Sequence, residues 1–152
     1  MSKRWVRLVL PLIAVAAIAA TLPLAGASST RNYPVNATLK SREVETRGNV
    51  AIDAGLFRDS RLGEGAAIVR TRSAGGSDLA IRFKAFYPVG MQKGTGTLTF
   101  AVQPDGTVTF TGNGRYTGGT KEFRGIGGRL RFNGTVTADG LVTTEVRGNA
   151  RY

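Results

Sequence analysis

The side chains that could do chemistry in this chain are acids, amines and phenols, because its 152 residues include no histidine and no cysteine. Serine–histidine and cysteine–histidine catalysis, thiol chemistry and the usual zinc and copper sites are therefore excluded. General acid–base work falls to Asp, Glu, Lys or Tyr, and metal binding falls to oxygen ligands for a hard ion. The ten carboxylates have no calcium-loop spacing, and no glycine loop joins a strand to a helix. We therefore expect neither a metal nor a cofactor.

One cluster of candidate catalytic residues remains, the run Phe57–Gly65, FRDSRLGEG. If it is functional, Asp59 donates or accepts a proton, with its pKa raised by a largely apolar cavity. Arg58 or Arg61 would then orient an anionic or quinone-like oxygen of the ligand. The alternative is structural, since Asp59 and Ser60 are also residues that form a turn and hydrogen-bond to nearby backbone.

Two tyrosines are candidate ligand-binding residues. Tyr87 and Tyr116 stand near the ends of predicted strands, in the same phase as Phe83, Phe100, Phe110 and Phe132, which we expect to face inward. The tyrosine hydroxyls could therefore meet a ligand at the mouth of a cavity. The alternative is that both are core aromatics whose hydroxyls reach backbone carbonyls.

Strands must position these candidates, because apolar and polar residues alternate along most of the chain and helical periodicity is confined to its N-terminus. The predicted strands cover residues 35–42, 47–57, 65–72, 78–87, 94–103, 107–115, 128–136 and 141–151. Turns are expected at Pro104–Gly106 and Ala138–Gly140, and a loop or one helical turn at 118–127. Eight strands are what a small barrel needs, so we predict an all-β, eight-stranded antiparallel, calycin-like barrel.

The segment Tyr116–Gly125, YTGGTKEFRG, is similar to the GGTGxFxxAxG signature of the dirigent and allene oxide cyclase barrel superfamily. Lys121 stands where the signature has its third glycine, and the resemblance is closest over residues 94–152. It implies an eight-stranded antiparallel barrel with an internal cavity, which plant relatives use to hold or cyclise small hydrophobic molecules. For the Asp59 segment it implies a position near the barrel mouth, with the carboxyl facing the cavity.

The N-terminus has the order of a secretory signal peptide. Lys3, Arg4 and Arg7 precede an uncharged apolar stretch, and a small-x-small site ends at Ala27. The alternative is an uncleaved membrane anchor. We expect a signal peptide over 1–27, a lead-in segment over 28–34 and one barrel domain over 35–152, secreted by the general route and with no membrane span after cleavage.

The chain carries a net charge of +11, and loss of Lys3, Arg4 and Arg7 with the signal peptide leaves +8. A basic surface attracts anionic partners such as acidic wall or matrix polymers, but it also serves solubility. The basic residues alternate out of phase with the aromatics, so the stacking surface that single-stranded nucleic acid needs is not expected.

The leading functional hypothesis is therefore a barrel that holds a small hydrophobic ligand in a pocket at one end, with Tyr87 and Tyr116 at its rim. The residues leave open whether the protein is an enzyme. The second hypothesis is a cyclase or stereo-directing protein that uses Asp59, without His, Cys or metal. A third is a basic surface-interaction protein that binds anionic wall or matrix polymers.

Overall fold

The computed structural model describes residues 31–152, which form eight β-strands and one short 3-10 helix. The elements are β1 Asn32–Arg47, β2 Val50–Asp59, β3 Gly63–Gly75, β4 Asp78–Tyr87, β5 Gly90–Val102, β6 Val108–Gly119, η1 Lys121–Phe123, β7 Arg129–Val136 and β8 Leu141–Arg151. The predicted signal peptide lies outside the described residues. β1 begins within the predicted lead-in segment, at Asn32. No helix of residues 31–152 is long and apolar enough to cross a membrane.

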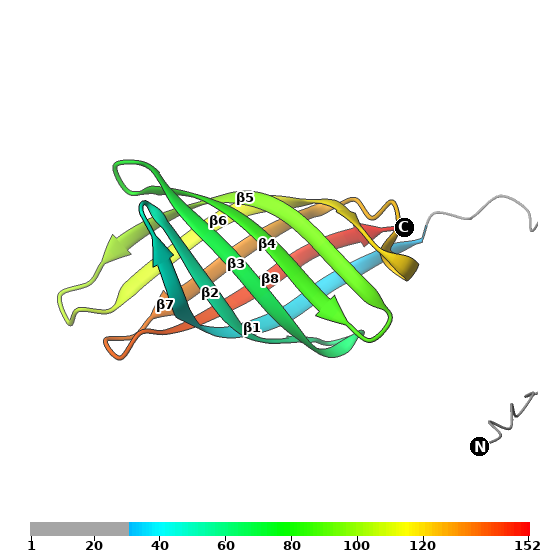
Figure 1. Cartoon of the computed structure of the whole chain (residues 1–152), viewed down its shortest axis with the longest axis horizontal. Coiled ribbons are helices and arrows are strands. Elements are labelled where there is room, and N and C mark those ends of the chain that lie inside the picture. The colour runs from blue at the N-terminus through cyan, green and yellow to red at the C-terminus, as the bar shows by residue number, and fades with distance from the viewer. Residues whose placement is uncertain (1–30) are drawn as a thin grey trace, which may run out of the picture.

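Each strand pairs antiparallel with the next one along the chain, and β1 also pairs with β8 (Figure 1). The sheet is therefore a closed barrel in which every strand has two neighbours, and its ladder leaves no edge exposed. This confirms the predicted fold class. It also explains how a chain without cysteine can order its backbone, since both sides of each strand are hydrogen-bonded.

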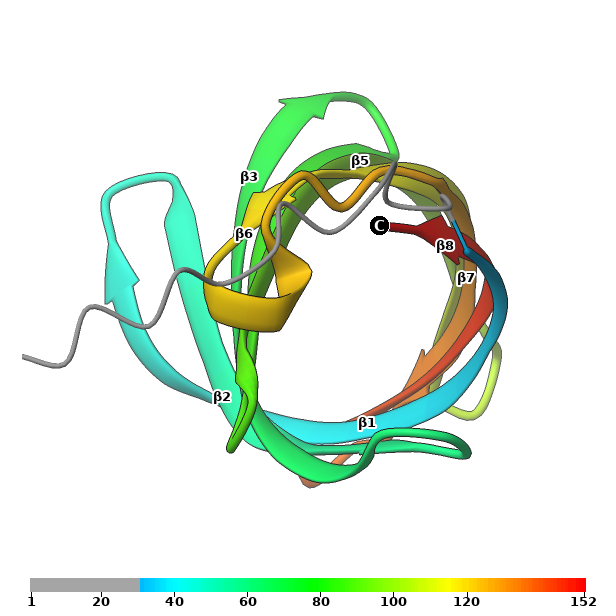
Figure 2. The same cartoon turned by 90° about the vertical axis from the view of Figure 1, so that its right-hand side faces the viewer.

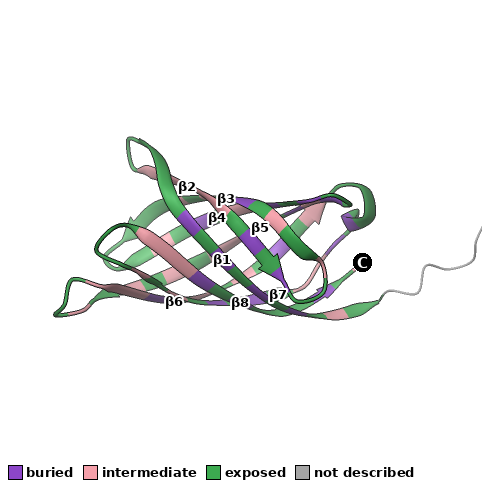
Figure 3. Ribbon diagram, turned by 90° about the horizontal axis from the view of Figure 1, so that it is seen from below, coloured by how far each residue is buried: buried purple, intermediate pink, exposed green. Residues whose placement is uncertain are grey.

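Buried and exposed residues alternate along the strands, as the banding of Figure 3 shows. On β1 the buried positions are Val35, Ala37, Leu39 and Ser41, with exposed residues between them. The period of two places one set of side chains inside the barrel and the other in solvent. Basic residues out of phase with the aromatics, such as Arg82 and Lys84 on β4, are exposed.

Three inward phenylalanine rings lie against glycines of neighbouring strands. A Cβ atom on the glycine would stand 2.3 Å from a ring atom at Gly134–Phe110, 2.3 Å at Gly94–Phe83 and 2.6 Å at Gly114–Phe132. Real Cβ atoms do not approach so closely, so the absence of a side chain at these glycines lets the rings lie close against the wall. The barrel can thus be lined with aromatics and still keep open space at its centre.

The two ends of the barrel differ. At one end lie the four hairpins that join β1 to β2, β3 to β4, β5 to β6 and β7 to β8, and we call this the hairpin end. At the other end the segment 120–128, with η1, extends over one side of the barrel opening (Figure 2). We call this the closed end, because Phe123 and Ile126 from that segment are buried there, at 1% and 3% exposed. The predicted loop or helical turn at 118–127 is confirmed.

Backbone hydrogen bonds hold this segment in place. The Thr120 N–H donates to the Met91 carbonyl at 2.8 Å, and the Gly127 and Arg151 backbones exchange hydrogen bonds at 3.0 and 2.9 Å. Lys121 has a φ of +52°, and among the described residues it is the one non-glycine with positive φ. It therefore adopts the left-handed conformation that glycine favours.

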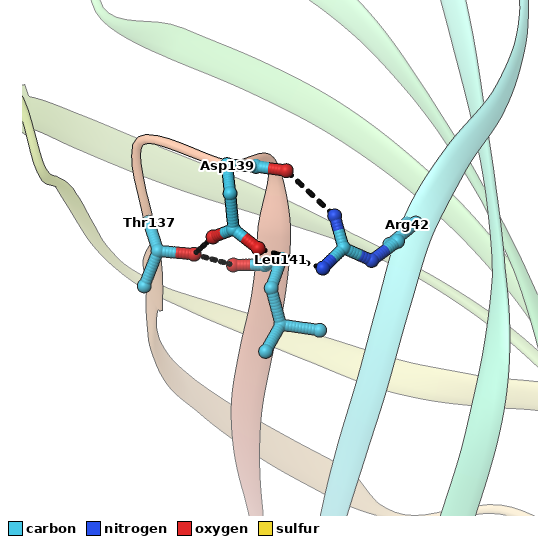
Figure 4. Close-up of polar contacts among 4 residues, drawn as sticks. All are labelled: Arg42, Thr137, Asp139 and Leu141. Carbon is cyan, nitrogen blue, oxygen red and sulfur yellow. Dashed lines mark hydrogen bonds and ion pairs between the residues drawn. The ribbon is translucent and has the colours of Figure 1, made fainter.

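At the hairpin end, an ion pair joins the β7–β8 turn to β1 (Figure 4). The Arg42 guanidinium donates to a carboxylate oxygen of Asp139 at 2.7 Å and to its carbonyl at 2.6 Å. The Thr137 hydroxyl also donates to Asp139, and the two side-chain donors lower the pKa of Asp139 to about 2, with Thr137 the larger cause. Both predicted turns are confirmed, with Gly106 at φ +82° and Gly140 at φ +79°.

Candidate functional site

A cavity of about 510 Å³ lies inside the barrel and extends toward the hairpin end. Its lining includes Glu43 and Gly140, both exposed, so it reaches solvent at that end. Phe57 and Tyr116 line its inner part, and the buried layer around Phe123 lies beyond them. The volume is within the range of small-molecule sites in proteins.

Most of the cavity wall is apolar, and each strand contributes to it. The contributions include one residue from each strand in turn: Leu39, Phe57, Val69, Ile81, Leu98, Phe110, Phe132 and Val146. The four phenylalanines predicted to face inward, Phe83, Phe100, Phe110 and Phe132, all line it. Such a wall attracts an apolar molecule, because binding removes apolar surface of both partners from water.

Four polar side chains line the part of the cavity formed by β8, β1 and β2, among apolar ones. Glu43 and Asp53 are directly opposite each other in the β1–β2 register, and both line the cavity. Ser41 and Thr144 are diagonal neighbours across β1 and β8 and line it at a greater depth. We call these four residues, Ser41, Glu43, Asp53 and Thr144, the polar stripe.

The environment of Asp53 favours its protonated form. Burial is the larger cause that raises the pKa of this carboxyl, and the negative charge of Glu43 raises it further. Glu43 itself accepts a hydrogen bond from the Thr46 hydroxyl. A carboxyl with a raised pKa inside a cavity is a typical functional group, either as a proton donor or as a partner for a ligand.

Asp53 is not among the site residues predicted from the sequence. The signal was present, because Asp53 is in phase with Phe57 and Asp59 on the same strand and therefore points inward. The position of Asp53 opposite Glu43 could not be predicted from this alternation. It depends on the register between β1 and β2, which includes a bulge between Glu43 and Glu45.

Gln92 and Tyr116 line the inner end of the large cavity and also a second cavity of about 10 Å³ nearer the closed end. They therefore form a partition between the two. The small cavity has room for about one water molecule and not for an organic ligand. Gln92 is 3% exposed.

Asp59 lies on the far side of this partition. It lines the small cavity, and it is absent from the lining of the large one. One carboxylate oxygen accepts hydrogen bonds from the backbone N–H of Arg61 at 2.8 Å and of Leu62 at 2.9 Å. These contacts are those of the structural alternative, an aspartate that holds the β2–β3 turn.

The two predicted arginines point to different places. Arg58 is outside the barrel, where it forms an ion pair with Glu64 in which both side chains are exposed. Arg61 lines the small cavity, with its guanidinium carbon 3.8 Å from the centre of the Tyr33 ring. The structure thus brings Asp59, Arg61 and Tyr116 together at the closed end and leaves Arg58 apart.

The two predicted tyrosines face inward, as expected, but they lie deep in the barrel and not at its rim. Each is 7% exposed. Tyr116 packs against Phe83, and Tyr87 packs against Phe57 and Phe123 in the closed end. Burial is the main cause that raises the pKa of both phenols, and the charge of Asp59 adds to it.

The Tyr87 hydroxyl is buried without a hydrogen-bond partner among the described residues. Removing an unsatisfied buried hydroxyl is stabilising, so we expect Tyr87→Phe to raise the free energy of unfolding by about 1 kcal/mol. Burial raises the pKa of Tyr87 in the folded state, so the folded protein favours the neutral phenol. The free energy of unfolding is therefore unaffected by this titration below the unfolded pKa and falls as the pH rises above it. Tyr87→Phe should therefore also move alkaline unfolding to higher pH. Urea unfolding across the pH range, with Tyr33→Phe as control, tests both; a destabilised variant would contradict the assignment.

Comparison with models of protein families, with curated proteins and with solved structures gave no match to this chain. Among residues 31–152, no group of three or more acidic side chains is arranged to hold a metal ion. The fold and the site define the class of the protein as an eight-stranded closed antiparallel β-barrel with an apolar internal cavity.

Proposed function

We propose that this protein is an exported barrel that binds a small hydrophobic molecule in its cavity. The observation that carries the proposal is the cavity itself, about 510 Å³ of mainly apolar space that reaches solvent at the hairpin end. Barrels of eight strands are wide enough either to be filled by side chains or to hold one small ligand. Here the glycines beneath Phe83, Phe110 and Phe132 keep the rings against the wall, which favours the second case.

Two features of the sequence support the same proposal. The resemblance of Tyr116–Gly125 to the dirigent and allene oxide cyclase signature is a likeness to barrels whose cavity holds small hydrophobic molecules. The signal-peptide pattern over residues 1–27 favours secretion, and N-terminal sequencing of the exported protein should then begin at or near Ser28.

Binding can be tested with N-phenyl-1-naphthylamine, a neutral probe whose fluorescence rises in apolar surroundings. We expect saturable binding of one probe per chain, with an affinity that changes little with salt, because the contact is apolar. Failure of this probe and of neutral aliphatic alcohols to bind would contradict the proposal.

The rival function is a cyclase or stereo-directing activity in which Asp59 transfers a proton. Asp59→Asn separates the two functions well, because the amide oxygen can still accept the hydrogen bonds from Arg61 and Leu62 that hold the turn. The rival function requires that turnover or product handedness be lost in this variant. Ligand binding alone requires that probe affinity remain close to that of the wild type.

A basic surface-interaction role is a second candidate, and the strand register favours it. On the outer face, four pairs of like charge stand directly opposite one another: Arg70–Arg82, Lys84–Lys93, Arg115–Arg129 and Arg131–Arg147. Within residues 31–152, Arg147 alone of these eight has a carboxylate partner, Glu145 at 3.4 Å. Like charges across a ladder are destabilising, and a polyanion would offset their repulsion.

This second role can be tested with polygalacturonate. Binding should weaken steeply as salt is added, and Arg82→Gln with Arg115→Gln should weaken it more than the control Arg47→Gln, which removes an exposed cation at the hairpin end. Binding that does not respond to salt would exclude this role.

A further inference from the structure

Among residues 31–152, the side chains that line the large cavity bring negative charge to it and no positive charge. Glu43 and Asp53 are the only ionisable side chains in this described lining apart from the phenol of Tyr116, although the chain has 21 lysines and arginines. The wall thus presents two acids, and no described cation, to this cavity. Two carboxylates on directly opposite positions repel each other in a partly apolar site, and a bound cation would remove that repulsion.

Buried polar side chains that line the same cavity are a second, independent observation. Ser41 is 4% exposed, Thr144 is 8% exposed and Gln92 is 3% exposed. The side-chain hydrogen bonds among residues 31–152 include none that uses these three side chains. Buried polar groups normally have partners, so a site that leaves three of them free toward one cavity is suited to a ligand with polar hydrogens.

The positions of the acids and the hydroxyls on β1, β2 and β8 define the shape of the polar part of the cavity. Ser41 lies two residues from Glu43 on β1, with Thr144 beside it on β8, so the polar stripe runs inward from the acids. Apart from Thr71, Gln92 and Tyr116, the remaining wall is apolar. A matching ligand has an apolar body against the rings and a donor-rich head beside the acids.

We propose that the cavity selects a small apolar molecule with a protonated amine, and that Asp53 and Glu43 hold the ammonium group while Ser41 and Thr144 take further polar atoms of the ligand. The proposal rests on the proposed function and names the class of ligand. Ammonium is preferred to a neutral donor because its positive charge offsets the repulsion between the two carboxylates, which an alcohol cannot do.

The affinity for such a ligand should depend on pH. β1 and β3 are the strands that pair with β2; directly opposite Asp53, β1 presents Glu43 and β3 presents Val69, so the charge facing Asp53 is that of Glu43. The amine stays protonated at neutral pH, and the carboxyl must ionise to pair with it. Because the pKa of Asp53 is raised, affinity should strengthen as the pH rises through that raised pKa.

Displacement of N-phenyl-1-naphthylamine by decylamine, decanol and decanoate tests the proposal, because the three share one apolar chain and differ in the head group. We expect decylamine to bind about tenfold more tightly than decanol, and decanoate to bind least well. In the double variant Asp53→Asn, Glu43→Gln, the advantage of the amine should disappear while the affinity for decanol is kept. Glu45→Gln is the matched control, since it removes an exposed carboxylate of β1 that does not line the cavity.

The outcomes separate this inference from the proposed function. Equal affinity for the three heads, or preference for decanoate, overturns the amine proposal and leaves the binding function in place. An amine preference that survives in the double variant overturns the assignment of Asp53 and Glu43. If none of the four molecules binds, the proposed function fails and the amine proposal fails with it.

Discussion

Phe123→Ala is expected to lower the free energy of unfolding by about 3–5 kcal/mol, the usual cost of removing a fully buried phenylalanine. Phe123 is 1% exposed, and it packs against Tyr87 and Tyr152 at ring-centre distances of 5.7 and 5.5 Å. A Cβ on Gly119 would stand 2.6 Å from the Phe123 Cβ, so the site is tightly enclosed and cannot collapse around the gap. Urea unfolding measures the loss.

The control is Phe86→Ala, which deletes the same ring from an outward position on β4 that is 39% exposed. Its cost should be about 1 kcal/mol or less, because much of that ring is already in water. Equal losses in the two variants would mean that segment 120–128 does not close the barrel end as described.

The second large effect is expected from filling the cavity. Val69 on β3 and Val136 on β7 both line it, so Val69→Trp with Val136→Trp places two indole rings in the space that a ligand needs. Affinity for N-phenyl-1-naphthylamine should fall by more than about tenfold. Fluorescence titration measures the change.

The matched control moves the same two substitutions by one residue, to the outer face. Ile68 and Thr135 are exposed neighbours of the two valines, so Ile68→Trp with Thr135→Trp adds identical side chains outside the barrel. Probe affinity should stay near that of the wild type. If both double variants lose affinity equally, or neither does, the probe is not bound in the cavity.

Much of the fold could be predicted from the sequence, because inside and outside follow a period of two along each strand. Phe83 and Phe132 face inward as expected, and the outward arginines are in solvent. The period fixes the face but not the depth along the barrel axis. Depth depends on register and on what covers each end, which is why Tyr87 and Tyr116 lie deep in the barrel and not at its rim.

Less of the candidate site than of the fold could be predicted from the sequence, for a related physical reason. Asp59 was a candidate because of its neighbours in the sequence. A cavity, however, is lined by residues from strands that are far apart in the chain. Asp53 and Glu43 meet only because β1 and β2 pair with a particular register and bulge. The sequence pattern also does not predict which end of the barrel is covered, because this depends on how segment 120–128 packs against the ends of β5 and β8.

Intermolecular nuclear Overhauser effects between decanol and isotope-labelled methyl groups test the central claim most directly, because they report which methyls touch the ligand. The account predicts contacts to the cavity residues Val69, Leu98 and Val142. It predicts none to Val44, Leu56 and Val102, which are 63%, 72% and 67% exposed on the barrel exterior or its rim. Contacts confined to this second set would contradict the claim that the barrel interior is the binding site.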